Sequence, residues 1–192
     1  MNDKIILVDC DGVLLDWFAI YQIWMRNKGY EILEGVNNYD VAKCYGIDRS
    51  ESKKLVRFFN ESANMCCLPP LRDAVKYIRK IHEEKGYVFH CITSLSTDPY
   101  AVRLREQNIK KLFGETAFDQ ILCLDTGADK DEALLPYLDS GCIWVEDKVK
   151  NAELGDRMGL TALLMDHEYN KDCDNEDISR VKNWKEIYEM VS

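Results

Sequence analysis

The stretch that decides the fold is MNDKIILVDCDGVLLDW, residues 1–17. Its apolar run, Ile5–Val8, is typical of a strand in a parallel sheet, because such strands are covered on both faces. The run ends in Asp9 and Asp11, with Gly12 directly after them. Burying a single charge is costly, and two nearby carboxylates raise each other's pKa unless a cation joins them. The stretch is therefore either a plain strand end with acids in the next turn, or a site built for a metal and a reaction.

The composition of the chain sets limits on its partners. The 192 residues carry a formal net charge of −9, and 46% of them are hydrophobic. That content is enough for a sizeable core, in one domain or in a core with a small insertion. The acidic balance argues against polymeric nucleic acid or an anionic membrane as the main partner. A small anionic ligand is still compatible, because a bound cation can reverse the local field. Composition leaves the choice between a monomer and a homodimer open.

The sequence also indicates a compartment. No stretch is long and apolar enough for a membrane span, and the N-terminus lacks the pattern of a secretion signal. Three of the eight cysteines, Cys91, Cys123 and Cys142, lie in strand-like runs, where cysteine acts as a small hydrophobic residue. No pair of cysteines has Cys-x-x-Cys spacing, which disfavours a zinc site. We therefore expect a reduced, cytoplasmic protein with no membrane partner.

Alternating strand and helix patterns predict the fold class. Strands are expected at residues 4–9, 87–93, 120–124, 142–147 and 161–165. Helices are expected at about 71–86, 98–113, 129–138 and 148–158, with a further helical segment around 183–187. Strands that alternate with helices form parallel sheets with helical crossovers. The sequence therefore predicts an α/β fold with a Rossmann-like, doubly wound parallel sheet.

Residues 14–68 break this alternation. They contain no convincing strand, but they carry two helical patterns, LLDWFAIYQIWMRNKG (14–29) and RSESKKLVRFFNES (49–62). An insertion of about 55 residues is longer than an ordinary crossover connection. We expect this segment to form a helical cap over the carboxyl edge of the sheet. Residues 1–13 and 69–192 would then form the α/β core.

Polar residues follow several of the predicted strands. The second strand ends in Thr93 and Ser94, the fourth ends in Glu146 and Asp147, and Lys130 opens the helix before the fourth. Ligands of open parallel sheets bind outside the carboxyl ends of the strands, near a topological switch point. These acids, hydroxyls and lysine are therefore expected to meet at one edge.

This set of side chains matches the needs of Mg²⁺ and a phosphate group. Mg²⁺ takes about six oxygen ligands, usually one or two carboxylates with waters and phosphate. Asp9, the backbone carbonyl of Asp11, and Asp147 could supply the protein ligands. Thr93 and Lys130 could then hold the other phosphate oxygens.

Taken together, these motifs resemble those of the haloacid dehalogenase superfamily of phosphohydrolases, in an order that spans almost the whole chain. The resemblance implies that Asp9 is a nucleophile that forms an aspartyl-phosphate. It implies that Asp11 is the general acid and base. It also implies a Mg²⁺ cofactor. Gly12 lets the backbone come close to the phosphate and offers N–H groups to it, and Ser94 is expected to bind substrate as well.

Five segments show a narrower resemblance to the 5′(3′)-deoxyribonucleotidases. They are DCDGVLLDW (9–17), CLPPLRDAVKYIRKI (67–81), CITSLS (91–96), MDHEYNKD (165–172) and RVKNWKEI (180–187). This resemblance implies a nucleoside monophosphate as substrate, with Trp17 stacking on its base. Glu146 stands where the family often has Asp, and Asn151 stands where some relatives carry another acid. Glu146 is therefore expected to support the metal site rather than to bind the metal directly.

Plainer interpretations exist for these residues. Each acid could be a turn or capping residue, and the Trp17, Tyr21 and Trp24 stripe could be core packing. His82, His90 and His167 are scattered, and we expect them to be structural. Three other functions stay open from the sequence. They are a phosphatase of a sugar phosphate or other small metabolite, a phosphatase of nucleic-acid ends, and a non-catalytic binding module.

Overall fold

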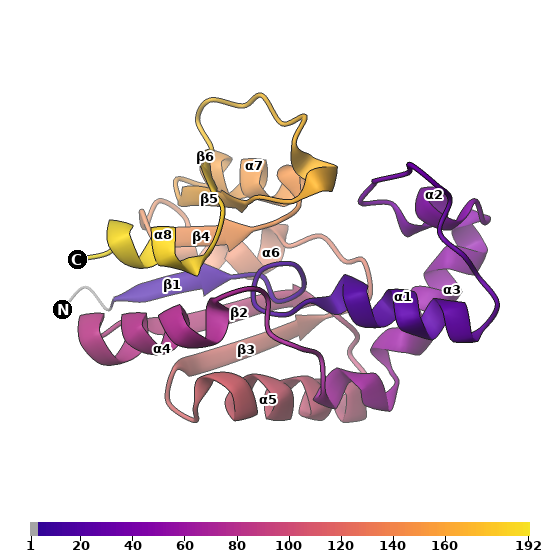
Figure 1. The fold of residues 1–192 in the computed structure, drawn as a ribbon. Helices are drawn as coiled ribbons and strands as arrows, with labels where there is room; N and C mark the ends of the chain where they lie inside the picture. Colours follow the sequence, from indigo (N-terminus) through magenta and orange to yellow (C-terminus); the bar gives the residue numbers. More distant parts are fainter. Residues whose placement is uncertain (1–3) are drawn as a thin grey trace.

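The computed structural model describes residues 4–192, which form a parallel sheet in the order β3-β2-β1-β4-β5-β6 (Figure 1). The strands are β1 (Ile5–Val8), β2 (Val88–Ser94), β3 (Phe118–Leu124), β4 (Ile143–Glu146), β5 (Thr161–Met165) and β6 (Ser179–Val181). The predicted α/β class and doubly wound parallel sheet are therefore confirmed. The strand order reverses between β1 and β4, so the loops after these two strands meet at the switch point.

Helices cover both faces of the sheet. The α-helices are α1 (Trp17–Asn27), α2 (Val41–Tyr45), α3 (Arg49–Asn60), α4 (Ala74–Lys85), α5 (Pro99–Phe113), α6 (Asp131–Leu134), α7 (Val149–Arg157) and α8 (Trp184–Met190). Three 3₁₀ turns are η1 (Ala63–Cys66), η2 (Leu135–Tyr137) and η3 (Glu168–Asn170). In Figure 1, α4, α5 and α8 lie in front of the sheet, whereas α6 and α7 lie behind it.

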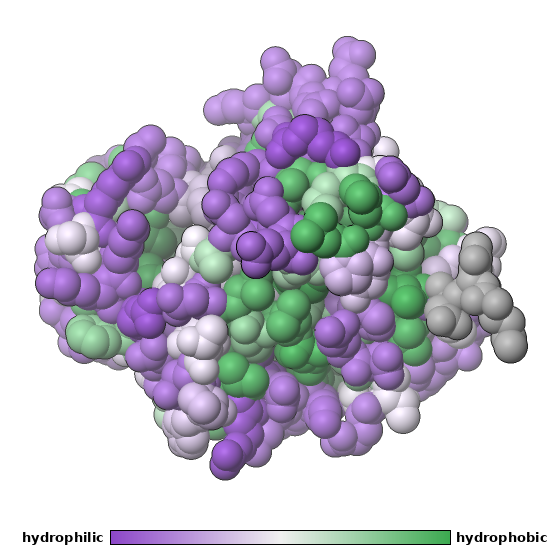
Figure 2. All heavy atoms as spheres, turned by 180° about the vertical axis from the view of Figure 1, so that it is seen from behind, coloured by the Kyte–Doolittle hydropathy of each residue, from purple (hydrophilic) through white to green (hydrophobic). Residues whose placement is uncertain are grey.

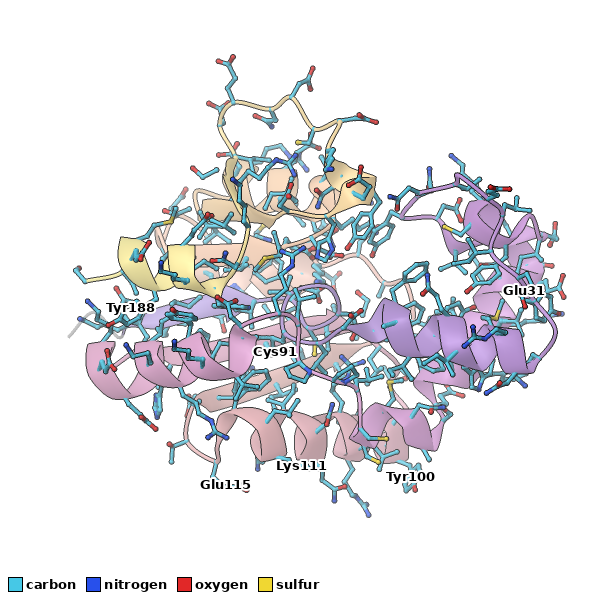
Figure 3. All side chains as sticks on the ribbon, viewed as in Figure 1. Glu31, Cys91, Tyr100, Lys111, Glu115 and Tyr188 are labelled. Atoms are coloured by element: carbon cyan, nitrogen blue, oxygen red, sulfur yellow. The ribbon has the colours of Figure 1, made fainter. Side chains whose placement is uncertain are left out.

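Side chains of β1 alternate between the two layers of the core. Ile6 and Val8 belong to the large cluster under α4, α5 and α8, whereas Leu7 belongs to the cluster under α6 and α7. All three are fully buried. This alternation, with apolar residues on both faces, is why an unbroken apolar run forms a central strand. Cys91 of β2, labelled in Figure 3, lies near the centre of the molecule in the same large cluster.

One predicted element differs in detail, and two short elements, α2 and β6, were not predicted. The helix expected at 129–138 is divided into α6 and the 3₁₀ turn η2, because Pro136 cannot continue the α-helical hydrogen bonds. Strand β6 was not predicted, and it is only three residues long. The short α6 and η2 give the back of the sheet a thin cover. Figure 2 shows hydrophobic residues gathered in the middle of that face, and Leu135 and Leu138 are exposed.

The C-terminal helix is tied to the first half of the core. Asp73 accepts hydrogen bonds from the backbone N–H groups of Trp184 and Lys185, at 3.0 and 3.2 Å. Tyr188, labelled at the α8 end in Figure 3, donates a hydrogen bond to Glu84 of α4 at 2.6 Å. All eight cysteines are free thiols. Within residues 4–192, every helix is too short or too polar to cross a bilayer.

Helices α1, α2, α3 and the turn η1 lie together beside the carboxyl end of the sheet (Figure 1). We keep the term cap for residues 14–68. An aromatic cluster fills its interior, formed by Trp17, Tyr21, Trp24, Tyr45 and Phe59. Arg57 of the cap pairs with Asp125 of the core at 2.9 Å. The aromatic residues of the cap therefore continue the large apolar cluster of the core, and Arg57 adds a polar contact.

Candidate active site

Backbone hydrogen bonding and a close approach at Gly12 hold the loop after β1 against the loop after β4. The Asp9 N–H donates to the Val145 carbonyl at 2.9 Å, which extends the pairing of the two strands by one residue. Gly12 has a φ of +79°, and a Cβ at this position would lie 2.3 Å from Asp147 Oδ2. Only glycine allows both the left-handed backbone and this close approach. The local sequence therefore brings the first acidic loop onto the second.

Three carboxylates and one lysine form the centre of the site. Oxygens of Asp9, Glu146 and Asp147 lie within 4.8 Å of one another, and all three residues are buried. Lys130 Nζ lies 2.7 Å from Asp9 Oδ1 and 2.6 Å from Glu146 Oε1. Burial by itself would lower the pKa of Lys130, but Asp9 and Glu146 raise it, so the ammonium stays charged. The sequence-predicted Asp9, Lys130 and Asp147 are thus brought together.

Glu146 is fully engaged by protein groups. Its Oε1 accepts from Lys130 and from Asn151 Nδ2, the latter at 2.7 Å. Its Oε2 accepts from the N–H groups of Asp147 and Lys148, both at 2.9 Å. Burial works to raise the pKa of Glu146, but Lys130 and these hydrogen bonds hold it below its ordinary value. Glu146 therefore anchors Lys130 and the start of α7, with no free oxygen lone pair for a metal.

The carboxylate of Asp147 has fewer hydrogen-bond partners than that of Glu146. Its Oδ1 is buried and has no hydrogen-bond partner among the described residues, whereas Oδ2 accepts from the Tyr169 hydroxyl. Burial, with Glu146 and Asp9 nearby, raises its pKa well above the ordinary value. Burial, with Glu146 and Asp11 nearby, raises the pKa of Asp9 to about 7, although Lys130 opposes this shift. A buried carboxylate oxygen without a partner is costly unless something outside the chain satisfies it.

Asp11 lies next to this cluster but faces another partner. Both of its carboxylate oxygens accept from Arg105 of α5, at 2.5 and 3.1 Å. Arg105 is completely buried, and the Asp11 side chain is 24% exposed. Asp11 is therefore fixed at the edge of the site by a group that the sequence interpretation missed.

The hydroxyls after β2 have different surroundings. Thr93 is buried at the end of β2, with 1% of its surface exposed. Ser94 donates its hydroxyl hydrogen to the Ala128 carbonyl at 2.8 Å. Ser94 thus holds the loop that leads to Lys130, and its predicted role in substrate binding is still a prediction.

Trp17 begins α1 and is partly exposed. One face of its ring stacks on Tyr21 with a centroid distance of 4.4 Å, and its Nε1 donates to Asn60 Oδ1 at 2.9 Å. The Asn60 side chain in turn donates to the Leu95 carbonyl of the core at 2.8 Å. Trp17 is therefore held rigidly at the junction of cap and core, and stacking on a base is still a prediction.

The segment after β5 supports the site in a way that the sequence did not reveal. His167 Nε2 lies 2.7 Å from the Gly12 carbonyl, and its ring stacks on Tyr169 at 4.8 Å. Asn170 donates to the backbone carbonyl of Asp147 at 2.8 Å. The structural role expected for His167 fits these contacts, although the residue lies at the site rather than away from it. The only sequence signal was MDHEYNKD, residues 165–172, in the resemblance described above.

A cavity of about 160 Å³ opens beside Asp147, where a loop of the cap meets the core. Tyr39 of the cap contacts Tyr169 edge to face at 5.7 Å, and Lys148 Nζ lies 5.3 Å from the centre of the Tyr39 ring. These three residues and Asp147 line the cavity. The loop that carries Tyr39 therefore contacts the core next to the carboxylates.

Comparisons with solved structures place the fold among known hydrolases. A haloacid dehalogenase-like hydrolase from Streptococcus pneumoniae superposes with a TM-score of 0.68 at 14% identity, over 98% of each chain. CbbY from Rhodobacter sphaeroides, in complex with phosphate, gives 0.63 at 15% identity over 96% of each chain. A D,D-heptose bisphosphate phosphatase from B. bronchiseptica, complexed with magnesium and phosphate, gives 0.62 at 12% identity over 97% of each chain. At these identities the likeness shows the fold.

Sequence comparison identifies the family. An uncharacterized 32.4 kDa protein of Enterobacteria phage T4 is 26% identical over 133 residues, which cover 66% of this chain. The chain spans about half the length of that relative, 47%. The family model for 5′ nucleotidase, deoxy (pyrimidine), cytosolic type C protein matches residues 3–192. The chain therefore belongs to the family of the 5′ nucleotidase, deoxy (pyrimidine), cytosolic type C protein.

Proposed function

We propose that this protein is a Mg²⁺-dependent phosphomonoesterase that releases phosphate from (deoxy)ribonucleoside monophosphates through an aspartyl-phosphate on Asp9. One observation carries the proposal. Asp9, Lys130 and Asp147 converge at the switch point of the sheet, in a chain that matches a 5′ nucleotidase family over residues 3–192.

The donor set fits a small divalent cation. Asp147 Oδ1 is buried without a partner, and the second oxygen of Asp9, Oδ2, is not the one bound to Lys130. Hard cations such as Mg²⁺ prefer oxygen ligands of this kind. Asp9, Asp147 and the backbone carbonyl of Asp11 would hold the ion. When bound, Mg²⁺ would neutralise charge on the phosphate oxygens during transfer.

The residues of the chain would divide the reaction into two steps. In the first, a carboxylate oxygen of Asp9 attacks phosphorus, the ester P–O bond breaks, and the leaving oxygen takes a proton from Asp11. In the second, water gives a proton to Asp11 and attacks the same phosphorus. Inorganic phosphate then leaves, and the Asp9 carboxylate is regenerated.

Lys130 is suited to stabilise the transferring phosphoryl group. An ammonium group has three N–H donors, and two of those of Lys130 are directed at Asp9 and Glu146. The third is available to a phosphate oxygen. Thr93, at the end of β2, would donate from the neighbouring strand. Stabilisation of charge is usually the largest contribution to phosphoryl transfer.

The cap would select the leaving group. Trp17 would offer an aromatic surface to the base. The net charge of −9 favours a small phosphorylated substrate over polymeric nucleic acid or an anionic membrane. We place the activity in the cytoplasm, in line with the family description.

A substrate panel tests the proposal. Phosphate release would be measured with Mg²⁺ for dTMP, dUMP, UMP, a 3′-monophosphate and several sugar phosphates, with Asp9→Asn as the blank. We expect selective hydrolysis of nucleotides by the native protein and none by the variant. Hydrolysis of sugar phosphates alone would contradict the nucleotide substrate, whereas no release from any ester would contradict the enzymatic function.

A further inference from the structure

Arg105 is buried beneath the candidate site without any role in the chemistry described so far. It lies on α5, and its surface is 0% exposed. Its Nη1 donates to Asp11 Oδ1 at 2.5 Å and to Cys10 Sγ at 2.7 Å. Its Nη2 lies 3.1 Å from Asp11 Oδ2 and 3.3 Å from Met65 Sδ. Asp11 is therefore the one charged partner of this guanidinium within the described residues.

The guanidinium of Arg105 has weak hydrogen-bond partners for a residue whose role is only to stabilise the fold. Its Nε is buried and has no partner among the described residues. Two of its contacts are sulfur atoms, which are weak acceptors. Replacing a buried ion pair by apolar side chains is often neutral or stabilising, because removing both charges from water is costly. Stability alone therefore does not explain the ion pair of Arg105 and Asp11, which points to a role in the reaction.

The two hydrogen bonds to Asp11 are unequal. The bond from Nη1 to Oδ1 is short, whereas Oδ2 is held more loosely by Nη2. The carboxyl group can thus keep Oδ1 on Arg105 while Oδ2 turns away. A general acid must lie within hydrogen-bond reach of the leaving oxygen. A carboxylate anchored through one oxygen samples fewer orientations than a free, partly exposed side chain, so its other oxygen is more often in position to react.

From this geometry we propose that Arg105 is a positioning residue that anchors Asp11 through Oδ1 and leaves Oδ2 to exchange the proton with the leaving group and with water. This inference rests on the proposed phosphomonoesterase function, and it adds a residue that acts only through Asp11. Met65 belongs to η1, which joins the cap to the core, so the anchor also contacts the base of the cap.

The test compares two esters that differ in their need for an acid. The 5′-oxygen of dTMP requires a proton to leave, whereas p-nitrophenolate leaves without one. Since kcat/KM reports the steps up to departure of the leaving group, Arg105→Met should lower it for dTMP by about 100-fold, within the usual range for general acid catalysis. The value for p-nitrophenyl phosphate should change only a few-fold, about the size of a minor effect on binding.

Three further variants make the result decisive. Arg105→Lys should recover most of the loss, because a single charged donor is enough for the pivot. If Arg105→Met does not fold, Arg105→Gln, which is likewise uncharged, replaces it in each comparison. Arg105→Met combined with Asp11→Asn should be no worse than Asp11→Asn alone, because both remove the same function. Arg103→Met, on the same helix but exposed, is the matched control.

The outcomes separate the inference from the proposed function. Equal losses for both esters, or additive losses in the double variant, would overturn the role of Arg105 while the native protein stayed an active phosphatase. Absence of turnover by the native protein on either ester would overturn the proposed function, and this inference with it.

Discussion

The carboxyl edge of the sheet and the cap hold their candidate functional residues by different means. At the edge, Asp9 and Lys130 are buried and fixed by ion pairs of 2.6–2.7 Å that include Glu146. In the cap, Trp17 is partly exposed and Tyr39 is 50% exposed, and both are held mainly by aromatic contacts. Transfer of a phosphoryl group needs reacting atoms fixed closely, whereas recognition of a leaving group tolerates adjustment. Changes at the edge should therefore lower kcat, and changes in the cap should raise KM.

The largest effect is expected at Lys130. Lys130→Met should lower kcat for nucleotide hydrolysis by about 1,000-fold, because it removes a preorganised donor for the phosphoryl group. The variant also leaves Asp9 and Glu146 buried without their cation, so its melting temperature should fall. Steady-state kinetics and thermal melts check both effects.

Lys150→Met is the matched control for this variant, because Lys150 pairs with Asp129 on the surface and its side chain is 62% exposed. It should keep native kcat. A native kcat with a raised KM in Lys130→Met would contradict the expectation that changes at the carboxyl edge lower kcat.

Removal of metal should change stability in a pH-dependent manner. Burial raises the pKa of Asp9 from its ordinary value of 3.8 to about 7. The folded state then binds more protons than the unfolded state between these values, so the metal-free protein should lose stability as pH rises from about 4 to 7. Mg²⁺ should therefore raise the melting temperature more at pH 8 than at pH 5, since protons compete for the same oxygens.

Thermal melts with Mg²⁺ and with a chelator measure this effect. Asp147→Asn should abolish most of the Mg²⁺-dependent increase, whereas Asp172→Asn, in an exposed loop, should not change it. An equal Mg²⁺ effect at both pH values would contradict the assignment of Asp9 and Asp147 as ligands.

A smaller effect is expected at Tyr169, which donates to Asp147 Oδ2. Tyr169→Phe removes one hydroxyl, and loss of such a supporting hydrogen bond typically weakens metal binding by about 10-fold. Isothermal titration with Mg²⁺ measures this change in Kd. Tyr100→Phe is the control, because Tyr100 lies exposed on α5, where Figure 3 labels it. Native affinity in Tyr169→Phe would show that Asp147 needs no such support.

An effect of about the same size, but on KM, should come from the cap. Trp17→Ala should raise KM for nucleotides by about 10-fold, the equivalent of about 1.4 kcal/mol, a typical value for one aromatic stacking contact. KM for p-nitrophenyl phosphate, which has no base, should change less, and Trp17→Phe should recover most of the difference. Equal changes for both substrates would assign Trp17 to packing on Tyr21 alone.

The sequence allowed most of the sheet and its carboxyl edge to be predicted, because the signals are local. An apolar run followed by Asp9 identifies β1 and its loop, and the run before Glu146 does the same for β4. Strand β6 could not be recognised, since three residues carry too little pattern. Pro136 could have indicated the end of α6, because proline cannot continue the α-helical hydrogen bonds.

The supporting residues of the site were harder to predict. Arg105 lies 94 residues from Asp11, on a helix with several charged residues, where an arginine is usually solvated. Tyr169 lies 22 residues from Asp147, in a short polar segment after β5. Neither contact has a local signature, because each arises only when the crossovers bring distant elements together. Glu146 illustrates the intermediate case, since its position was predicted but its full set of partners needed the structure.

The most direct test of the account is a chemical trap for the aspartyl-phosphate. The native protein would be mixed with dTMP and Mg²⁺, quenched in acid within one turnover and treated with borohydride, which reduces an acyl phosphate to the alcohol. Peptide mass analysis should then find homoserine in place of Asp9, and the unmodified residue in a sample without substrate. Phosphate release at the native rate with no reduced residue at position 9 would show that Asp9 is not the nucleophile.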